Sequence, residues 1–169
     1  GGGFIPRIIS QARIDLHEHG IFDGEKSMEW GDCGTTILVD ASNGIGGYTD
    51  WIDKDSFFRK NFPCRIILDT TENAYYNFFV KEDVKIDYLH IDAGHSYKDV
   101  KNDFELYSKI LSPNGIISIH DTDESFEKEH IVTEDVSVQE HHDEFANGPS
   151  KLIEELKENK EWEIFNFFN

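Results

Sequence analysis

Short apolar runs alternate with polar and glycine-containing segments along the 169-residue chain. Four of these runs are rich in branched aliphatic residues and end on an aspartate: Thr35–Asp40, Arg65–Asp69, Ile86–Asp92 and Ile116–Asp121. Runs of this length predict buried strands. Helical patterns lie between them, so the alternation predicts an α/β fold with a mainly parallel sheet covered by helices on both faces.

A strand, a turn and a helix follow one another in the centre of the chain. The strand Ile86–Ile91 ends at Asp92, and Ser96 with Asp99 three residues later resembles a capping box that opens a helix. Apolar residues then recur at spacings of four, three and four, which places them on one helix face: Val100, Phe104, Tyr107 and Leu111. Ligands of open α/β folds bind at the carboxyl ends of strands, so we expect Asp92 and His95 to face a crevice.

Weaker signals assign the rest of the chain. We expect a helix over about Ile5–His19 with Ile8, Ile9, Ala12 and Leu16 inward, and a short aromatic helix over Ala74–Phe79. A turn is expected over Ser112–Gly115, in which Gly supplies a positive φ. The last elements are expected to be a helix from Ser150 to about Asn159 and an alternating strand over Glu161–Phe168. The polar segment 124–147 has little periodicity and is interpreted as a lid or an excursion. We expect residues 1–169 to form a single domain truncated at its N-terminus, because the chain opens on Gly1 without a Met.

The composition restricts the partners. The chain has 34 acidic residues against 16 Lys and Arg, a formal net charge of −18, which argues against nucleic acid and anionic membranes as partners because phosphate repels it. No apolar run approaches the length of a membrane span. The cysteines Cys33 and Cys64 match no metal-binding spacing, so we expect free thiols in the reducing cytoplasm.

The acidic strand ends supply the candidate chemistry. Asp40 is suited to accept hydrogen bonds from both hydroxyls of a ribose, although an ordinary strand-ending aspartate fits the same pattern. Asp92 and Asp121 end adjacent strands, and two carboxylates there suit Mg²⁺, with Asp123 as a further oxygen ligand. His95 titrates near neutrality and suits a general base. The alternative is a structural turn, in which the first aspartate caps the helix and the imidazole packs against the following tyrosine.

Two motifs carry a resemblance to a known family. They are Ile91-Asp92-Ala93-Gly94-His95-Ser96-Tyr97 and Ile117-Ser118-Ile119-His120-Asp121-Thr122-Asp123, with a Pro-Asn-Gly turn between them. With these motifs the chain resembles class I S-adenosylmethionine-dependent methyltransferases, and among them the metal-dependent sugar O-methyltransferases.

The resemblance implies a Rossmann-like sheet of seven strands with the last strand antiparallel. It also implies that the first strand, at the centre of the sheet, is missing from this chain. The cofactor would be S-adenosyl-L-methionine, bound by Gly1, Gly2, Gly3, Asp40, Asp69, Thr70 and Asp92.

We therefore expect methyl transfer to a hydroxyl of a small molecule such as a sugar or natural product, with Asp92 and His95 as the catalytic residues. Mg²⁺ bound by Asp92, Asp121 and Asp123 is a second way to activate the hydroxyl for the same step. The sequence is also compatible with a homo-oligomer. The alternatives are a nucleotide-binding module without chemistry and an α/β enzyme of another class, such as a nicotinamide-dependent oxidoreductase or a metal hydrolase. A complete Gly-x-Gly-x-x-Gly after a strand and a Gly-x-Ser-x-Gly elbow are both absent from the sequence, which disfavours an oxidoreductase and a serine hydrolase.

Overall fold

The structure is a computed structural model that describes residues 8–9, 11–12, 35–41, 64–122 and 147–165. The chain divides into two units, Gly1–Ala74 and Tyr75–Asn169. Residues 124–146 of the predicted lid over 124–147, the glycines Gly1, Gly2 and Gly3, and Asp123 lie outside the described residues. In the described segments, no helix combines the length and the apolar character that crossing a bilayer requires.

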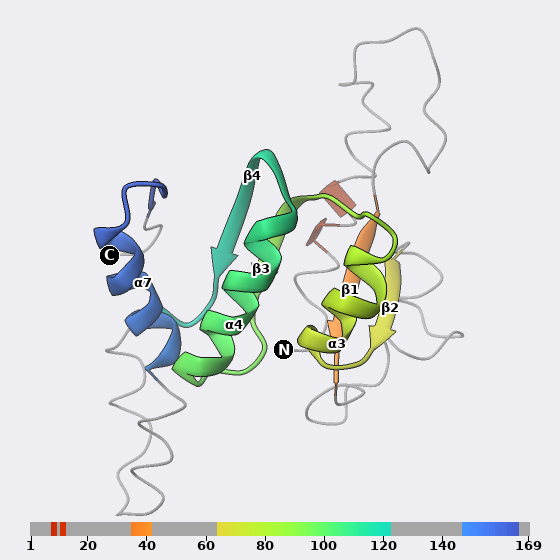
Figure 1. The fold of residues 1–169 in the computed structure, drawn as a ribbon, viewed down its shortest axis with the longest axis horizontal. Helices are drawn as coiled ribbons and strands as arrows, with labels where there is room; N and C mark the ends of the chain where they lie inside the picture. Colours follow the sequence, from red (N-terminus) through yellow and green to blue (C-terminus); the bar gives the residue numbers. More distant parts are fainter. Residues whose placement is uncertain (1–7, 10, 13–34, 42–63, 123–146, 166–169) are drawn as a thin grey trace, which may run out of the picture. The chain divides into compact units, whose positions relative to one another are not determined.

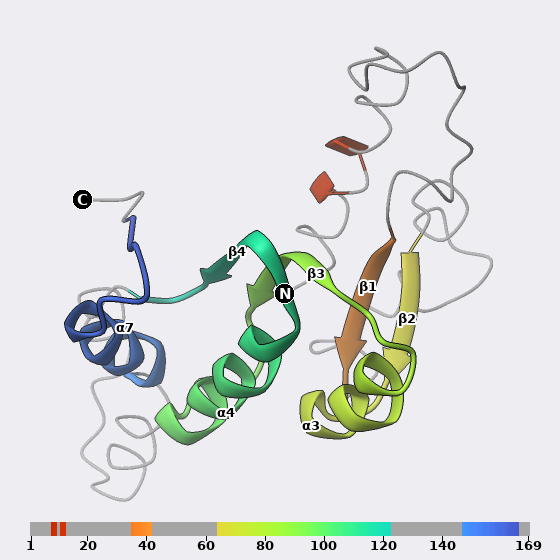
Figure 2. The same ribbon diagram turned by 45° about the horizontal axis from the view of Figure 1, so that its top comes forward.

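The first unit contains two of the predicted strands. β1 (Thr36–Asp40) and β2 (Cys64–Leu68) pair in parallel, with Leu38 opposite Ile66, and Figure 2 shows the two arrows side by side and pointing the same way. The short helix α3 (Thr71–Ala74) follows β2 and packs against β1. The prediction that Ile8 and Ala12 face inward is wrong, because both are exposed in the structure.

The second unit contains the other two predicted strands, also paired in parallel. β3 (Ile86–Ile91) and β4 (Leu111–Ile119) align Leu89 with Ile117 and Ile91 with Ile119. The pairing shifts near the start, because Ile86 lies opposite Leu111 whereas Tyr88 lies opposite Ile116. The predicted turn over Ser112–Gly115 is therefore an irregularity inside β4 rather than a separate loop.

The positive φ in this irregularity belongs to Asn114, at 66°, and not to Gly115 as expected. Asparagine tolerates the left-handed region better than most residues with a side chain. Gly115 is needed for a different reason: a Cβ there would lie 2.6 Å from Cγ of Leu111 and 3.0 Å from the carbonyl oxygen of Ile86. Crowding by the irregular start of β4 itself and by β3, rather than backbone freedom, explains this glycine.

The central helix begins where its cap signal predicts. Ser96 precedes α4 (Tyr97–Tyr107), and its Oγ accepts a hydrogen bond from the backbone N–H of Asp99 at 3.1 Å. A 3₁₀ turn, η4 (Ser108–Ile110), ends the helix, so Leu111 starts β4 and does not extend the helix as predicted.

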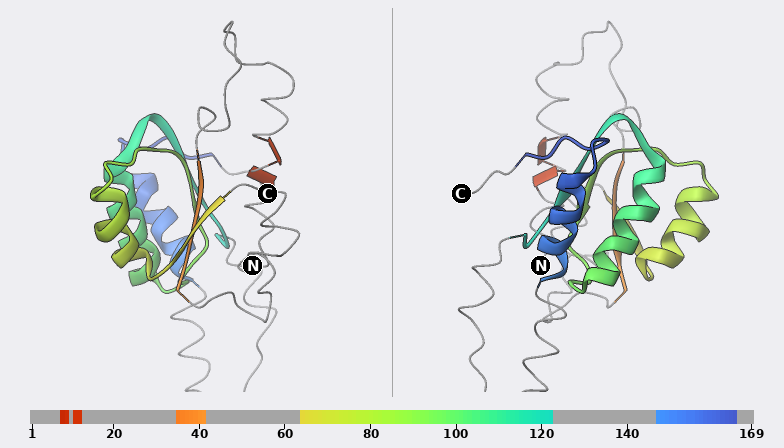
Figure 3. Two further views of the ribbon diagram at one scale, coloured as in Figure 1. Left: turned by 90° about the vertical axis from the view of Figure 1, so that its right-hand side faces the viewer. Right: turned by 60° about the vertical axis from the view of Figure 1, so that its left-hand side comes forward.

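The last described helix, α7 (Gly148–Glu158), starts two residues before the predicted cap. Asn147 precedes it, and Ser150 lies inside the first turn, where its Oγ donates to the carbonyl oxygen of Asn147 at 3.1 Å. α4 and α7 pack against each other and lie on one face of the β3–β4 pair (Figures 1 and 3). Their buried residues and one from β3 form a core cluster: Ile91, Val100, Phe104, Leu152 and Leu156.

The predicted final strand is not formed in its described part. Residues 159–165 are a turn and an irregular segment, while 166–168 lie outside the described residues. Asn159 causes the turn, because its Oδ1 accepts from the N–H of Glu161 at 3.0 Å and its carbonyl oxygen accepts from Trp162. The side chains of Trp162 and Ile164 still pack on the core cluster, so the alternating sequence pattern reflects the burial of these side chains rather than pairing in a strand.

The predicted aromatic helix is the π-helical segment η3 (Tyr75–Val80), which continues the chain after α3. Tyr75 and Phe79 are buried and contact the ring of Tyr107 edge-on, with centroids 5.4 and 5.2 Å away. These contacts confirm a packing role for the two buried aromatics.

Candidate functional site

The ends of β3 and β4 bring two predicted carboxylates to one edge. Because the strands are parallel, their carboxyl ends lie together, and the N–H of His120 donates to the carbonyl oxygen of Ile91 at 3.0 Å. This bond keeps the chains paired one residue beyond the strand, up to the positions of Asp92 and Asp121. The strand pairing therefore explains why two acids far apart in sequence meet.

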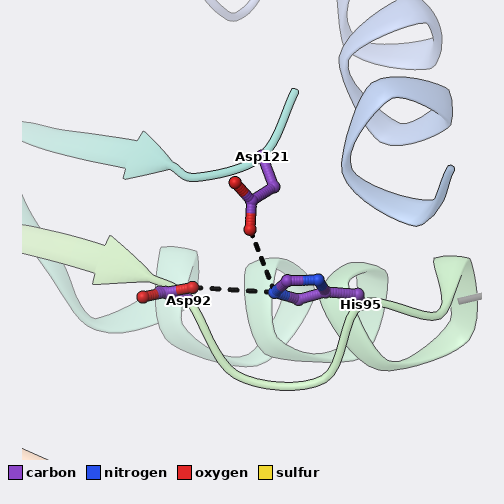
Figure 4. Close-up of side chains that lie close together, drawn as sticks. All are labelled: Asp92, His95 and Asp121. Carbon is purple, nitrogen blue, oxygen red and sulfur yellow. Dashed lines mark ion pairs between the residues drawn. The ribbon is translucent and has the colours of Figure 1, made fainter. Parts of the chain in front are cut away.

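His95 lies between the two carboxylates. Its Nε2 is 3.6 Å from Oδ1 of Asp92 and 3.4 Å from Oδ2 of Asp121, and Figure 4 shows both carboxylates directed at this nitrogen. The side chain of His95 is 35% exposed and those of both acids are 26% exposed, so the group is open to a ligand without being fully solvated. The distances are those of ion pairs rather than short hydrogen bonds.

A second histidine, which the sequence did not single out as a site residue, flanks the same carboxylates. Nδ1 of His120 lies 2.8 Å from Oδ1 of Asp121 and 3.6 Å from Oδ1 of Asp92. Alternation along a strand would direct neighbouring side chains to opposite faces. Asp121 has a φ of 53°, so the chain leaves the strand conformation and both side chains reach the site.

A polar network continues along β3 and β4 behind the carboxylates. Nδ1 of His90 is 2.8 Å from Oγ of Ser118, and the hydroxyl of Tyr88 is 2.7 Å from the same oxygen. The ring of His90 faces that of His120 edge-on with centroids 6.1 Å apart. The buried Nε2 of His90 has no hydrogen-bond partner among the described residues.

The electrostatics of the site favour an ionised Asp92. The interaction with His95 is the largest cause that lowers the pKa of Asp92 below its ordinary value, and partial burial opposes it. Burial is the largest cause that lowers the pKa of His90, so this imidazole is held in the neutral form. The site thus contains an ionised Asp92 and, next to it, the neutral imidazole of His90.

The turn that carries His95 is held from behind by α7. A Cβ at Gly148 would lie 2.0 Å from the carbonyl oxygen of His95 and 2.5 Å from the backbone nitrogen of Tyr97. Only glycine permits this approach. The side chain of Tyr97 points to α7, where its hydroxyl donates to Glu155, and Lys101 bonds both Glu155 carboxylate oxygens at 2.7 and 2.9 Å.

The other predicted cofactor residues are in the first unit. Asp40 ends β1, where a carboxylate suits a ribose diol. Asp69 uses Oδ1 to accept from the N–H of Thr70 at 2.8 Å and from the side-chain amide of Asn73 at 2.9 Å. Thr70 accepts from the N–H of Asn73 at 3.2 Å. Asp69 and Thr70 therefore start α3, a local structural role that the sequence interpretation did not include.

Comparison with known proteins identifies the class. A family model for a methyltransferase domain matches residues 14–122, which is more than half of the chain. The chain belongs to this family of methyltransferase domains, of the class I S-adenosylmethionine-dependent type with a Rossmann-like α/β fold. The parallel pairs β1–β2 and β3–β4 agree with that fold.

A second match covers a short segment of the chain. Over 42 residues the chain is 48% identical to the "Uncharacterized protein y4gI" of Sinorhizobium fredii (strain NBRC 101917 / NGR234), a segment that covers 25% of this chain and 5% of that protein. The chain thus spans about a twentieth of the length of this relative. No solved structure matches the chain.

The donor set of the site can be compared with the requirements of a cation. One ligand atom each from Asp92, His95 and Asp121 lies within 4.8 Å of the others. Carboxylate oxygens suit Mg²⁺, whereas an imidazole nitrogen suits transition metals better. The two acids therefore fit the predicted Mg²⁺, and the imidazole between them fits a proton-transfer role better than a place in a magnesium shell.

Proposed function

We propose that this protein transfers a methyl group from S-adenosylmethionine to a hydroxyl of a small molecule, such as a sugar or natural product. The family match supports methyl transfer in general. The observation that supports a hydroxyl acceptor is the position of His95 between Asp92 and Asp121. A hydroxyl is a weak nucleophile until its proton is removed, and a histidine held by carboxylates is suited to remove it.

His95 would act through the nitrogen that does not face the acids. Nε2 carries the proton that interacts with the carboxylates, which fixes the ring orientation and stabilises the imidazolium that forms. Nδ1, on the far side of the ring in Figure 4, is then the nitrogen that accepts the hydroxyl proton. The lowered pKa of Asp92 keeps its negative charge at neutral pH, as this role requires.

The cofactor contributes the reactive carbon. When bound, S-adenosylmethionine supplies a methyl group on a sulfonium, which is already activated for displacement. The chain contributes Asp40 for a ribose diol, and the carboxyl edge of β3 and β4 for the acceptor. Positioning and proton removal are the tasks left to the protein.

Divalent-cation assistance is a second candidate for the same step. The ligand atoms of Asp92, His95 and Asp121 lie within 4.8 Å of one another, and a cation held by the two acids would lower the pKa of a bound hydroxyl. Dialysis against EDTA followed by Mg²⁺ addition separates the two routes. Loss and recovery of turnover supports the cation, and unchanged turnover supports His95 acting without one.

The decisive experiment uses the full-length protein. Calorimetry with S-adenosylmethionine and with NAD tests the cofactor, and release of S-adenosylhomocysteine with a panel of monosaccharides and phenols tests the acceptor. The variant His95→Ala should bind S-adenosylmethionine as the wild type does and lose turnover by about 10²–10⁴-fold.

Glu158→Gln, an exposed carboxylate at the end of α7, is the matched control and should keep full turnover. Binding of S-adenosylmethionine without turnover on any acceptor would favour the nucleotide-binding module instead. Turnover that persists in His95→Ala would remove His95 from the base role.

A further inference from the structure

His120 makes the shortest ion-pair contact of the site. Its Nδ1 lies 2.8 Å from Oδ1 of Asp121, whereas the contacts of His95 with Asp92 and Asp121 are 3.6 and 3.4 Å long. The His120 contact is the closest of these and is an ion pair when the imidazole is protonated. Oδ1 of Asp121 therefore lies against His120, whereas Oδ2 faces His95 at a longer distance.

The two oxygens of Asp121 have different partners. Oδ1 faces His120 and Oδ2 faces His95. A close contact at Oδ1 limits rotation of the carboxylate about its last torsion and so restricts the direction of Oδ2. Asp121 has a φ of 53° and comes one residue after the last backbone hydrogen bond between the two segments, so its side chain is positioned by its own contacts.

The ring of His120 is itself supported from one side. His90 contacts it edge-on at 6.1 Å, and His90 is anchored through Nδ1 to Oγ of Ser118 at 2.8 Å. Oγ of Ser118 also contacts the hydroxyl of Tyr88 at 2.7 Å. The side chain of His120 is 54% exposed, so its ring is restricted by this support, by the Asp121 contact and by the longer contact of Nδ1 with Oδ1 of Asp92 at 3.6 Å.

We propose that His120 is a positioning residue of the methyltransferase site, which acts by holding the carboxylate of Asp121 so that its second oxygen directs the imidazole of His95. This inference rests on the proposed function, in which His95 accepts the hydroxyl proton. In this role His120 acts on Asp121 rather than on the reacting atoms. Its effect passes through Asp121, which makes the two residues a coupled pair.

Ring-nitrogen NMR tests the contact directly. In ¹⁵N-labelled full-length protein, Nδ1 of His120 should carry a proton, because it faces a carboxylate oxygen 2.8 Å away. In Asp121→Asn the signal of this nitrogen should change. An Nδ1 of His120 without a proton, or a signal that is unaffected by Asp121→Asn, would overturn the proposal.

Two amide substitutions separate the nitrogens of His120. The side-chain amide of Asn reaches the position of Nδ1, whereas that of Gln reaches the position of Nε2. His120→Asn should therefore keep the ring-nitrogen signals of His95 and most of the turnover. His120→Gln and His120→Ala should shift the His95 signals and lower kcat roughly tenfold, with KM for S-adenosylmethionine unchanged. Equal loss in the Asn and Gln variants would contradict the role of Nδ1.

A double-mutant cycle completes the test. If His120 acts through Asp121, adding His120→Ala to Asp121→Asn should lower kcat no further, whereas independent effects would multiply. Thermal unfolding of each variant shows whether a loss of turnover comes from loss of the folded structure. If the NMR results are as expected but no acceptor is methylated, the proposed function is rejected and the contact of His120 with Asp121 is established. If the protein turns over and the effects of the two substitutions on kcat multiply, only the positioning role is rejected.

Discussion

Nε2 of His95 lies 3.4 Å from Oδ2 of Asp121, although α4 and the whole of β4 separate the two residues in the chain. The parallel pairing of β3 and β4 produces this proximity, because it places both strand ends at one edge. The same pairing places Asp92 within 3.6 Å of the imidazole. The site is thus formed by β3, β4 and the turn that carries His95, all within the second unit.

Replacing Asp121 by Asn should lower turnover without disturbing the backbone. Asn tolerates the φ of 53° at this position, while the loss of charge removes the anion that faces His95. We expect kcat to fall roughly 10- to 100-fold, with the Kd for S-adenosylmethionine unchanged. Steady-state kinetics and calorimetry measure the two quantities. Wild-type kcat in the Asn variant would show that the charge at this strand end is not used.

A side chain at Gly148 should damage both stability and the site. In Gly148→Ala the new Cβ would lie 2.0 Å from the carbonyl oxygen of His95, so the turn or α7 must move. We expect the free energy of unfolding to fall by about 1–3 kcal/mol, as in other overpacked positions. Urea denaturation measures this, and the ring signals of His95 report the displacement. The exposed Lys151→Ala on the same helix is the control. Unchanged stability and unchanged His95 signals would contradict the close contact.

Truncating Leu152 should destabilise the second unit. Leu152 is 1% exposed in the core cluster formed by α4, α7 and β3. The change Leu152→Ala removes buried methyl groups and leaves a cavity, so the free energy of unfolding should fall by about 2–5 kcal/mol. The exposed Lys98→Ala on α4 should leave it within about 0.5 kcal/mol. Similar unfolding curves for both variants would argue against the packing of α7 on α4.

The link between α4 and α7 should depend on pH in the acid range. Bonds from Lys101 and then Tyr97 lower the pKa of Glu155 below its ordinary value of 4.5. A depressed folded pKa gives a stabilising contribution that is complete above the unfolded pKa and is lost as pH falls through the folded value. The stability difference between the wild type and Glu155→Gln should therefore be present at neutral pH and disappear in acid. Denaturation at several pH values measures it, and a pH-independent difference would exclude the ion pair as its source.

The sequence predicted the features that depend on local or strand-end rules. Ser96 caps α4 because a hydroxyl reaches an N–H three residues later, whatever lies elsewhere in the chain. Asp92 and Asp121 meet because parallel strands expose their carboxyl ends together. The first rule needs only the local sequence, and the second needs only the order of the elements, which the apolar runs supply.

The features that were not predicted depend on departures from regular backbone. His120 joins the site because Asp121 leaves the strand conformation, whereas alternation would have directed the ring to the opposite face. Its position beside a strand-ending acid was the one signal in the sequence. The described part of the expected last strand is irregular for a related reason, since Asn159 turns the chain while Trp162 remains packed on Phe104, with ring centroids 5.0 Å apart.

The contact of Gly148 with the backbone of His95 matters for where the functional unit ends. The methyltransferase match stops at residue 122, and a fragment cut there would still contain both acids and the histidine. It would lack the glycine of α7 against which the turn at His95 rests, and two of the five residues of the core cluster, Leu152 and Leu156. The residues that support the site therefore extend beyond the matched segment and include α7.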